Sequence, residues 1–175
     1  MATNRMKALQ IERHGGPEVM QLAEVPVPEP GPGEVRVRME ASGLNYSDIM
    51  MREGRYLRET HLPAVLGHEI CGVIEKSGAG MEDWRPGRRV IATTEEGGGL
   101  AECVIVKAAR LMACPGELTP PEGAALLVQG LTAIQLIDDA TKVRPGETVL
   151  VHAAAGGVGT LAIQIARARG ARVLG

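Results

Sequence analysis

The segment Ala154-Ala155-Gly156-Gly157-Val158-Gly159 contains the residue types that could hold a phosphate group. It has the spacing of a G-x-G-x-x-G motif with alanine in the first position. Gly156 would let a pyrophosphate approach the backbone, and Gly159 would let the following helix pack closely. The free N–H groups and positive dipole end of that helix attract phosphates. Ala154 must then have backbone torsions that alanine can adopt.

The elements predicted around this turn are those that such a motif needs. A buried strand is expected over 148–152, a helix with one apolar face runs from Gly157 to Gly170, and another strand starts at 172. This order favours a dinucleotide site, and the alternative is a glycine-rich turn in an unrelated β-α-β unit. The residue that distinguishes NAD from NADP falls roughly 20 residues after the glycines, beyond Gly175.

The first part of the chain has the pattern of an all-β domain. Short strands are predicted over 6–11, 35–39, 70–76, 89–93, 100–107 and 110–113, with a helix over 47–52 and a proline-rich connector over 25–34. Thr119-Pro-Pro-Glu122 has the form of a capping box. The helix that it starts is predicted to run to about residue 139, with a break at Gly130. The expected order is therefore an antiparallel barrel or sandwich, then β-α-β.

Composition excludes several classes of function. The net charge is −2 and no basic block occurs, so neither a nucleic-acid nor a membrane partner is expected. The uncharged stretch 148–166 is better explained by a buried strand and helix than by a membrane span, because it contains His152, Gln164 and several glycines. The three cysteines form no C-x-x-C pair and the N-terminus has no apolar signal core, which predicts a cytoplasmic protein.

Several segments together resemble one known family. The first is Gly146-Glu147-x-x-Leu150-x-x-x-Ala154-Ala155-Gly156-Gly157-x-Gly159-x-x-x-x-Gln164-x-x-Arg167. It is similar to the signature of the zeta-crystallin/quinone oxidoreductase branch of the medium-chain dehydrogenase/reductase superfamily. The N-terminal matches are Gly43-Leu44-Asn45-Tyr46-Ser47-Asp48, Leu66-Gly67-His68-Glu69 and Pro86-Gly87-x-Arg89-Val90, the last with Arg88 in place of aspartate.

The resemblance implies a mixed α/β fold. A GroES-like β-barrel catalytic domain would occupy 1–125, and the start of a Rossmann dinucleotide-binding domain would occupy 126–175. In the family the chain continues through the rest of the Rossmann sheet, so this sequence corresponds to a C-terminally truncated version of the pattern. The full-length form is expected to be a homodimer.

The resemblance also implies candidate site residues. Asn45 and Tyr56 would face the cleft near the nicotinamide and the substrate, and they are the candidate catalytic residues; an ordinary turn is the alternative for Asn45. Thr132, expected at the start of a helix, could be a cap or could contact the carboxamide. The complete set of candidate cofactor-binding residues is Asn45, Thr132, Ala155, Gly156, Gly157, Val158 and Gly159.

No metal site is predicted. Zinc-dependent relatives place a cysteine where this chain has Asn45, a histidine at His68 and another cysteine near Gln129. A catalytic zinc needs about three protein ligands, which these residues do not supply. Cys71 follows three positions after His68, and in an alternating strand their side chains would point to opposite faces.

The favoured function is a zinc-independent NAD(P)H-dependent oxidoreductase. It would use NADPH or NADH to reduce a small-molecule quinone or enone-type carbonyl by hydride transfer. Proton delivery would then fall to a tyrosine or to water. Two alternatives remain at this point: an enoyl-thioester reductase, and a non-catalytic truncated fragment whose cofactor site is unformed.

Overall fold

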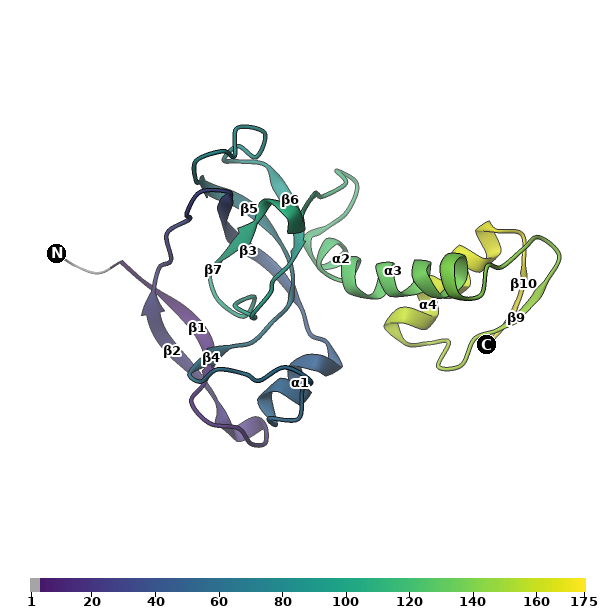
Figure 1. Ribbon diagram of the computed structural model, residues 1–175, viewed down its shortest axis with the longest axis horizontal. Helices are drawn as coiled ribbons and strands as arrows, with labels where there is room; N and C mark the ends of the chain where they lie inside the picture. The colour runs from purple at the N-terminus through teal and green to yellow at the C-terminus, as the bar shows by residue number, and fades with distance from the viewer. Residues whose placement is uncertain (1–3) are drawn as a thin grey trace. The chain divides into compact units, whose positions relative to one another are not determined.

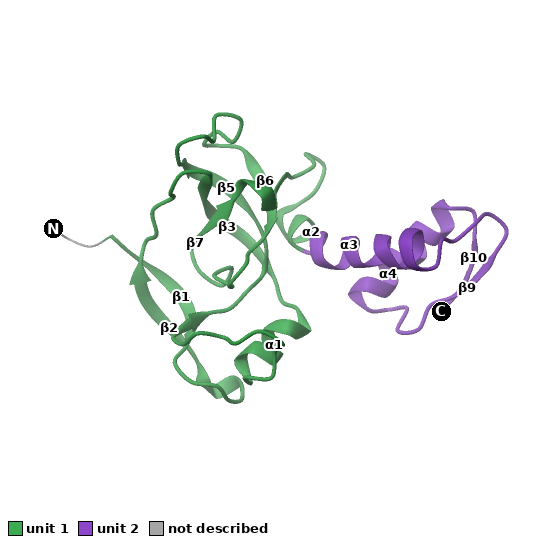
Figure 2. Ribbon diagram, viewed as in Figure 1, with its two compact units in different colours: residues 1–124 green, residues 125–175 purple. Residues whose placement is uncertain are grey.

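The computed structural model describes residues 4–175, which divide into two units (Figures 1 and 2). Unit 1 is Met1–Ala124 and unit 2 is Ala125–Gly175. Each unit has its own hydrophobic core. No helix among the described residues has both the length and the apolar character that crossing a bilayer requires.

Unit 1 contains two antiparallel sheets, with strand orders β7-β3-β5-β6-β8 and β2-β1-β4. The strands are β1 Arg5–Ile11, β2 Met20–Pro26, β3 Glu34–Gly43, β4 Ala64–Val65, β5 Glu69–Ser77, β6 Arg89–Thr93, β7 Cys103–Lys107 and β8 Leu111–Ala113. The helices of this unit are α1 Tyr46–Arg52, α2 Pro120–Ala124 and two 3₁₀ turns, η1 Pro17–Val19 and η2 Ala108–Arg110. A single bridge between Ala8 and Ala101 connects β1 to the segment before β7.

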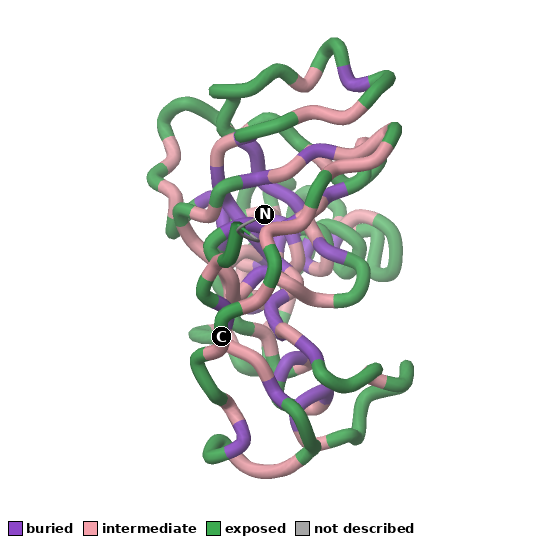
Figure 3. Tube along the Cα trace, turned by 90° about the vertical axis from the view of Figure 1, so that its left-hand side faces the viewer, coloured by how far each residue is buried: buried purple, intermediate pink, exposed green. Residues whose placement is uncertain are grey.

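Alternation along the strands of the larger sheet builds the main core. Every second residue points inward, as the period of a strand requires. The buried cluster is apolar, and all its members except Met81 lie on strands: Val35, Val37, Ile70, Ile74, Met81, Val90, Ala92, Val104 and Val106. Figure 3 colours the backbone by burial, with the buried residues in purple. Two register shifts in the β3–β5 ladder, at 36/37 and 39/41, are irregularities of the kind that bend a strand. A second cluster, formed by Ile11, Val19, Met51, Ala64 and Leu66, packs α1 and β4 against β1.

Unit 2 contains a β-α-β crossover preceded by a helical segment. Its elements are α3 Leu127–Ile134, the π-helical η3 Gln135–Ala140, β9 Thr148–Leu150, α4 Gly157–Ala168 and β10 Arg172–Leu174. β9 and β10 pair in parallel. The buried residues between α3, η3 and α4 are Ala133, Ile137, Ala162 and Ala166. The mixed α/β fold expected from the sequence is confirmed.

Several local predictions were wrong. Gly130 does not break a helix: it is buried inside α3, and the interruption lies earlier, between α2 and α3. A Cβ built on Gly130 would lie 3.9 Å from Leu161 Cδ1 of α4, so packing between the helices outweighs the poor helix propensity of glycine. The strand β2 was not predicted, and it extends into the proline-rich connector, to Pro26.

Candidate functional site

The glycine turn of unit 2 lies between β9 and α4. Gly156 is the N-cap of α4, with extended torsions, and its N–H donates to the carbonyl oxygen of Ala153 at 2.9 Å. The left-handed residue of the turn is Ala153, with φ 54°. Ala154 is not among the described residues with positive φ, so its backbone is one that alanine adopts without strain, as expected.

Two of the glycines are required by close contacts. A Cβ built on Gly159 would lie 2.3 Å from the carbonyl oxygen of Ala153 and 2.8 Å from Ala154 Cα. A Cβ on Gly157 would lie 2.8 Å from Gln129 Cγ of α3. The close packing predicted at Gly159 is therefore present, and it is made against the turn itself.

The N-terminus of α4 is available for an anion. No side chain caps Gly156, and the first turn contains no acidic residue. The N–H groups of the first helical residues have no acceptor within a helix. The Thr160 hydroxyl donates to the carbonyl oxygens of Gly156 and Gly157, at 3.0 and 3.1 Å, and so competes for none of these N–H groups.

Two other residues of unit 2 differ from their sequence predictions. Thr132 lies in the interior of α3, not at a helix start, and its hydroxyl donates to the Val128 carbonyl oxygen at 2.6 Å. A cap role for Thr132 is therefore wrong. His152 was expected to be buried, but it is exposed and lines an apolar hollow of 310 Å³ beside the glycine turn.

In unit 1, Asn45 is the N-cap of α1. Its backbone N–H donates to Asp48 Oδ2 at 2.8 Å, which is the capping-box arrangement. Its side-chain Nδ2 donates to Glu69 Oε2 at 3.3 Å. Glu69 is completely buried at the start of β5. Asn45 therefore anchors the start of α1 to a buried carboxyl group.

Asp48 is the centre of a small polar cluster. It is 2% exposed, and its Oδ1 accepts hydrogen bonds from the Gly67 N–H and from His68 Nδ1, both at 2.9 Å. Burial alone would raise the pKa of Asp48, but the hydrogen bonds from His68, Asn45 and Gly67 outweigh it and hold the pKa below its ordinary value. The carboxyl group is therefore ionised at neutral pH.

A groove of 990 Å³ lies beside this cluster, within unit 1. Tyr56 and His68 line it, together with Thr94 and the arginines Arg58 and Arg110. Tyr56 is 37% exposed, so its ring is accessible to a ligand in the groove. Asn45 is not among the described residues that line the groove, so the structure does not bring the two predicted catalytic residues into one pocket.

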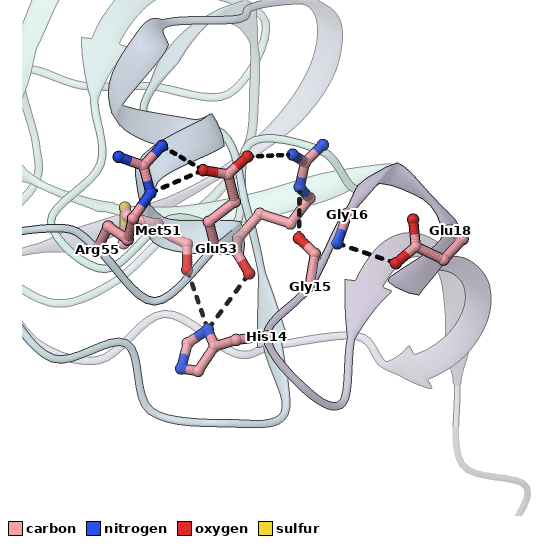
Figure 4. Close-up of polar contacts among 8 residues, drawn as sticks. His14, Gly15, Gly16, Glu18, Met51, Glu53 and Arg55 are labelled. Atoms are coloured by element: carbon pink, nitrogen blue, oxygen red, sulfur yellow. Dashed lines mark hydrogen bonds and ion pairs between the residues drawn. The ribbon is translucent and has the colours of Figure 1, made fainter.

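A network of charged groups holds the chain just before Tyr56 (Figure 4). The buried Arg52 donates to the Gly15 carbonyl oxygen at 3.1 Å and to Glu53 at 3.0 Å, and Glu53 also pairs with Arg55. His14 Nδ1 lies 3.1 Å from the Met51 carbonyl oxygen at the end of α1. These contacts fix the C-terminal end of α1, from which the loop carrying Tyr56 begins.

The cysteine and histidine side chains of unit 1 do not come together at one point. Cys71 Sγ lies 3.9 Å from Cys114 Sγ, whereas His68 faces Asp48. Burial, aided by the neighbouring Cys114 thiol, raises the pKa of Cys71 to about 12. Within residues 4–175, no group of three or more His, Cys, Asp or Glu side chains is arranged to hold a metal ion.

Sequence reasoning missed the pairing of His68 with Asp48. In the sequence the two residues stand in two separate segments, Gly43–Asp48 and Leu66–Glu69. The spacing Asn45-x-x-Asp48 was a usable signal, because an N-cap followed three residues later by an acidic residue places that carboxyl group at the start of a helix. Nothing local indicated that a histidine 20 residues later would meet it.

Comparisons with known proteins give one consistent result. Residues 31–116 match the family described as the alcohol dehydrogenase GroES-like domain. A quinone oxidoreductase of Lama guanicoe is 39% identical over 178 residues, which covers 100% of this chain and 54% of the relative. The chain spans about half the length of the curated relatives that it matches.

Two solved structures have folds similar to that of this chain. The quinone oxidoreductase from Thermus thermophilus, whose structure was also determined in complex with NADPH, has a TM-score of 0.83 and 46% identity over 96% of this chain and 52% of that one. The human synaptic vesicle membrane protein VAT-1 homolog-like protein has a TM-score of 0.93 and 30% identity over 97% of this chain and 55% of that one.

Proposed function

The chain belongs to the medium-chain dehydrogenase/reductase superfamily, among quinone oxidoreductase-like proteins, and from this premise we propose that it forms part of an NAD(P)H-dependent oxidoreductase. The substrate class that we propose is a quinone or an enone-type carbonyl. NADPH is the favoured cofactor, because the Thermus thermophilus relative was solved in complex with it.

The observation that carries the proposal is the uncapped N-terminus of α4, which follows directly on the glycine turn. The N-terminus of α4 has no side-chain cap and no acidic residue in its first turn. Gly159 admits a close approach of the turn to the helix that a side chain would prevent. A helix N-terminus that follows a strand and a glycine-rich turn is where dinucleotide phosphates bind.

Different residues of this chain would have separate roles in the proposed reaction. The backbone N–H groups of Ala155–Gly159 would hold the pyrophosphate, and Thr132 would have to turn its hydroxyl away from Val128 to contact the cofactor. A bound nicotinamide supplies the hydride. Tyr56 in the groove can donate a hydrogen bond to a substrate carbonyl oxygen, and the Asn45 amide can both donate and accept. No metal is part of the proposal.

A charge placed in the turn tests the cofactor site. Ala155 is exposed, so Ala155→Asp adds a carboxylate without filling the core. Like charges about 4 Å apart near a protein surface repel by up to ~4 kcal/mol, so NADPH affinity should fall at least tenfold. Ala155→Ser is the matched neutral control and should bind NADPH as the natural protein does.

The measurements are calorimetric titrations with NADPH and NADH, followed by turnover assays. The substrates would be 1,4-benzoquinone, an α,β-unsaturated ketone and an enoyl thioester. Turnover of the enoyl thioester alone would replace the proposed substrate class. Failure of the natural protein to bind either nucleotide, or equal binding by the Ala155→Asp variant, would overturn the proposal.

A further inference from the structure

The contacts of Asp48 determine the state of the His68 ring. Asp48 accepts three hydrogen bonds, from the Asn45 N–H, the Gly67 N–H and His68 Nδ1, at 2.8 to 2.9 Å. An ionised carboxyl group can only accept hydrogen bonds. His68 Nδ1 must therefore carry a hydrogen, and Nε2 is the ring nitrogen that can gain or lose a proton.

The backbone of His68 is held as firmly as its ring. The Thr94 N–H donates to the His68 carbonyl oxygen at 2.9 Å, and the Thr94 hydroxyl donates to the Gly67 carbonyl oxygen at 2.9 Å. Gly67 has φ 95°, and a Cβ built on it would lie 2.8 Å from the Leu100 backbone nitrogen, so the turn before His68 requires glycine. These contacts fix the histidine from its backbone and from Nδ1 together.

The position of His68 in the groove gives this arrangement a chemical use. His68 lines the 990 Å³ groove together with Tyr56 and Thr94, and 17% of its side chain is exposed. Among the described residues, no hydrogen bond to His68 Nε2 is present. A histidine whose Nδ1 is held by a carboxylate and whose ring lines a groove has the arrangement of a general acid or base.

We propose that His68, oriented by Asp48, supplies the proton that accompanies hydride addition to a substrate in the groove. The inference rests on the proposed function. Hydride addition to a quinone or enone leaves the electron pair on oxygen as a hydroquinone anion or an enolate. The Nε2–H bond of the His68 imidazolium breaks, its proton forms the new O–H bond, and the imidazole that remains keeps Nδ1–H on Asp48. Water then returns a proton to Nε2.

The first test reads the ring state of His68 without any turnover. Long-range ¹H–¹⁵N NMR distinguishes protonated from unprotonated ring nitrogens, and the His68→Gln variant assigns the signals. At a pH where the ring is neutral, we expect Nδ1 to be protonated and Nε2 unprotonated. His61, in the loop that lines the same groove, has no carboxylate partner among the described residues and is the comparison. A neutral His68 with its hydrogen on Nε2 would overturn the inference.

The second test uses chemical rescue in the natural protein. His68→Ala should lower kcat at least about 10²-fold, the usual contribution of a positioned proton donor. Added imidazole should restore part of the rate, whereas it should not raise the rate of His61→Ala. A structural role for His68 would produce no such rescue.

The outcomes separate this inference from the proposed function. If the natural protein turns over and His68→Ala keeps kcat within about threefold, or imidazole does not rescue the variant, only the role of His68 is wrong. If the natural protein binds neither NADPH nor NADH, the proposed function fails and this inference fails with it.

Discussion

Replacing Asp48 by asparagine exchanges one carboxylate oxygen for an NH₂ group. The carboxylate accepts hydrogen bonds from three N–H donors. Asp48 Oδ1 accepts from Gly67 and His68, and Oδ2 accepts from Asn45. An asparagine side chain has one oxygen and one NH₂ group. If its oxygen faces Gly67 and His68, its NH₂ faces the Asn45 N–H, donor against donor.

The size of the effect follows from these contacts. One hydrogen bond is lost and two lose their charged acceptor, and hydrogen bonds to charged groups contribute about 1.5–3 kcal/mol each. The site is nearly fully buried, so water cannot replace the lost partner. We therefore expect Asp48→Asn to lower the free energy of unfolding of unit 1 by about 2–4 kcal/mol.

The sign of the pH dependence is also fixed. The folded-state pKa of Asp48 lies below its ordinary value of 3.8. Its stabilising contribution is therefore present above pH 3.8 and is lost as the pH falls through the folded-state pKa. The natural chain should lose more stability than Asp48→Asn over this acidic range.

Tryptophan fluorescence during urea unfolding measures this effect. Trp84 is the only tryptophan, it belongs to unit 1, and it packs against the main core with Arg88 over its ring at 4.6 Å. Glu95→Gln is the control, because Glu95 forms an exposed ion pair with Lys107 and such pairs contribute little. An unfolding free energy for Asp48→Asn within about 0.5 kcal/mol of the natural value would refute the reasoning.

Two further predictions concern other parts of the chain. Gly159→Ala should lower the free energy of unfolding of unit 2 by about 1–3 kcal/mol, because the new Cβ would clash with the Ala153 carbonyl oxygen. Ala153→Gly should raise it by about 0.5–1 kcal/mol, because glycine adopts the left-handed torsion of this position without strain. Hydrogen exchange of the α4 amides measures both, and the same sign for the two variants would contradict the prediction. Cys71 should resist Ellman's reagent at pH 8 while Cys114 reacts, because burial raises the pKa of Cys71 to about 12. Mass spectrometry of the labelled protein measures the two reaction rates. Equal rates for Cys71 and Cys114 would show that the Cys71 thiol is not protected.

The sequence predicted best those elements whose signals are local. The helix after the glycine turn begins at Gly157 as expected, and Gly170, with φ 82°, follows its end. The strand Arg172–Leu174 was located correctly, because a short β-rich run followed directly on a helix end. In these cases neighbouring residues alone determine the conformation.

The sequence-based predictions were wrong or incomplete where the local structure depends on residues far away in the chain. Glycine has a low helix propensity, but α4 packs against α3 near Gly130 and α3 continues through it. The polar cluster depends on the loop before β5 bringing His68 onto the start of α1. No window of sequence contains both partners, so Tyr56 could be identified as a candidate from a motif while His68 could not be paired with Asp48.

The buried core of unit 2 consists mostly of small side chains. Three of the four buried residues in this core are alanines, Ala133, Ala162 and Ala166, which bury little apolar surface. Under the proposed function, a nucleotide that binds only the folded unit adds about 2.7 kcal/mol at a hundred times its dissociation constant. A lower nucleotide concentration would then leave unit 2 unfolded more often and open to proteases, and the lifetime of the protein would depend on that concentration.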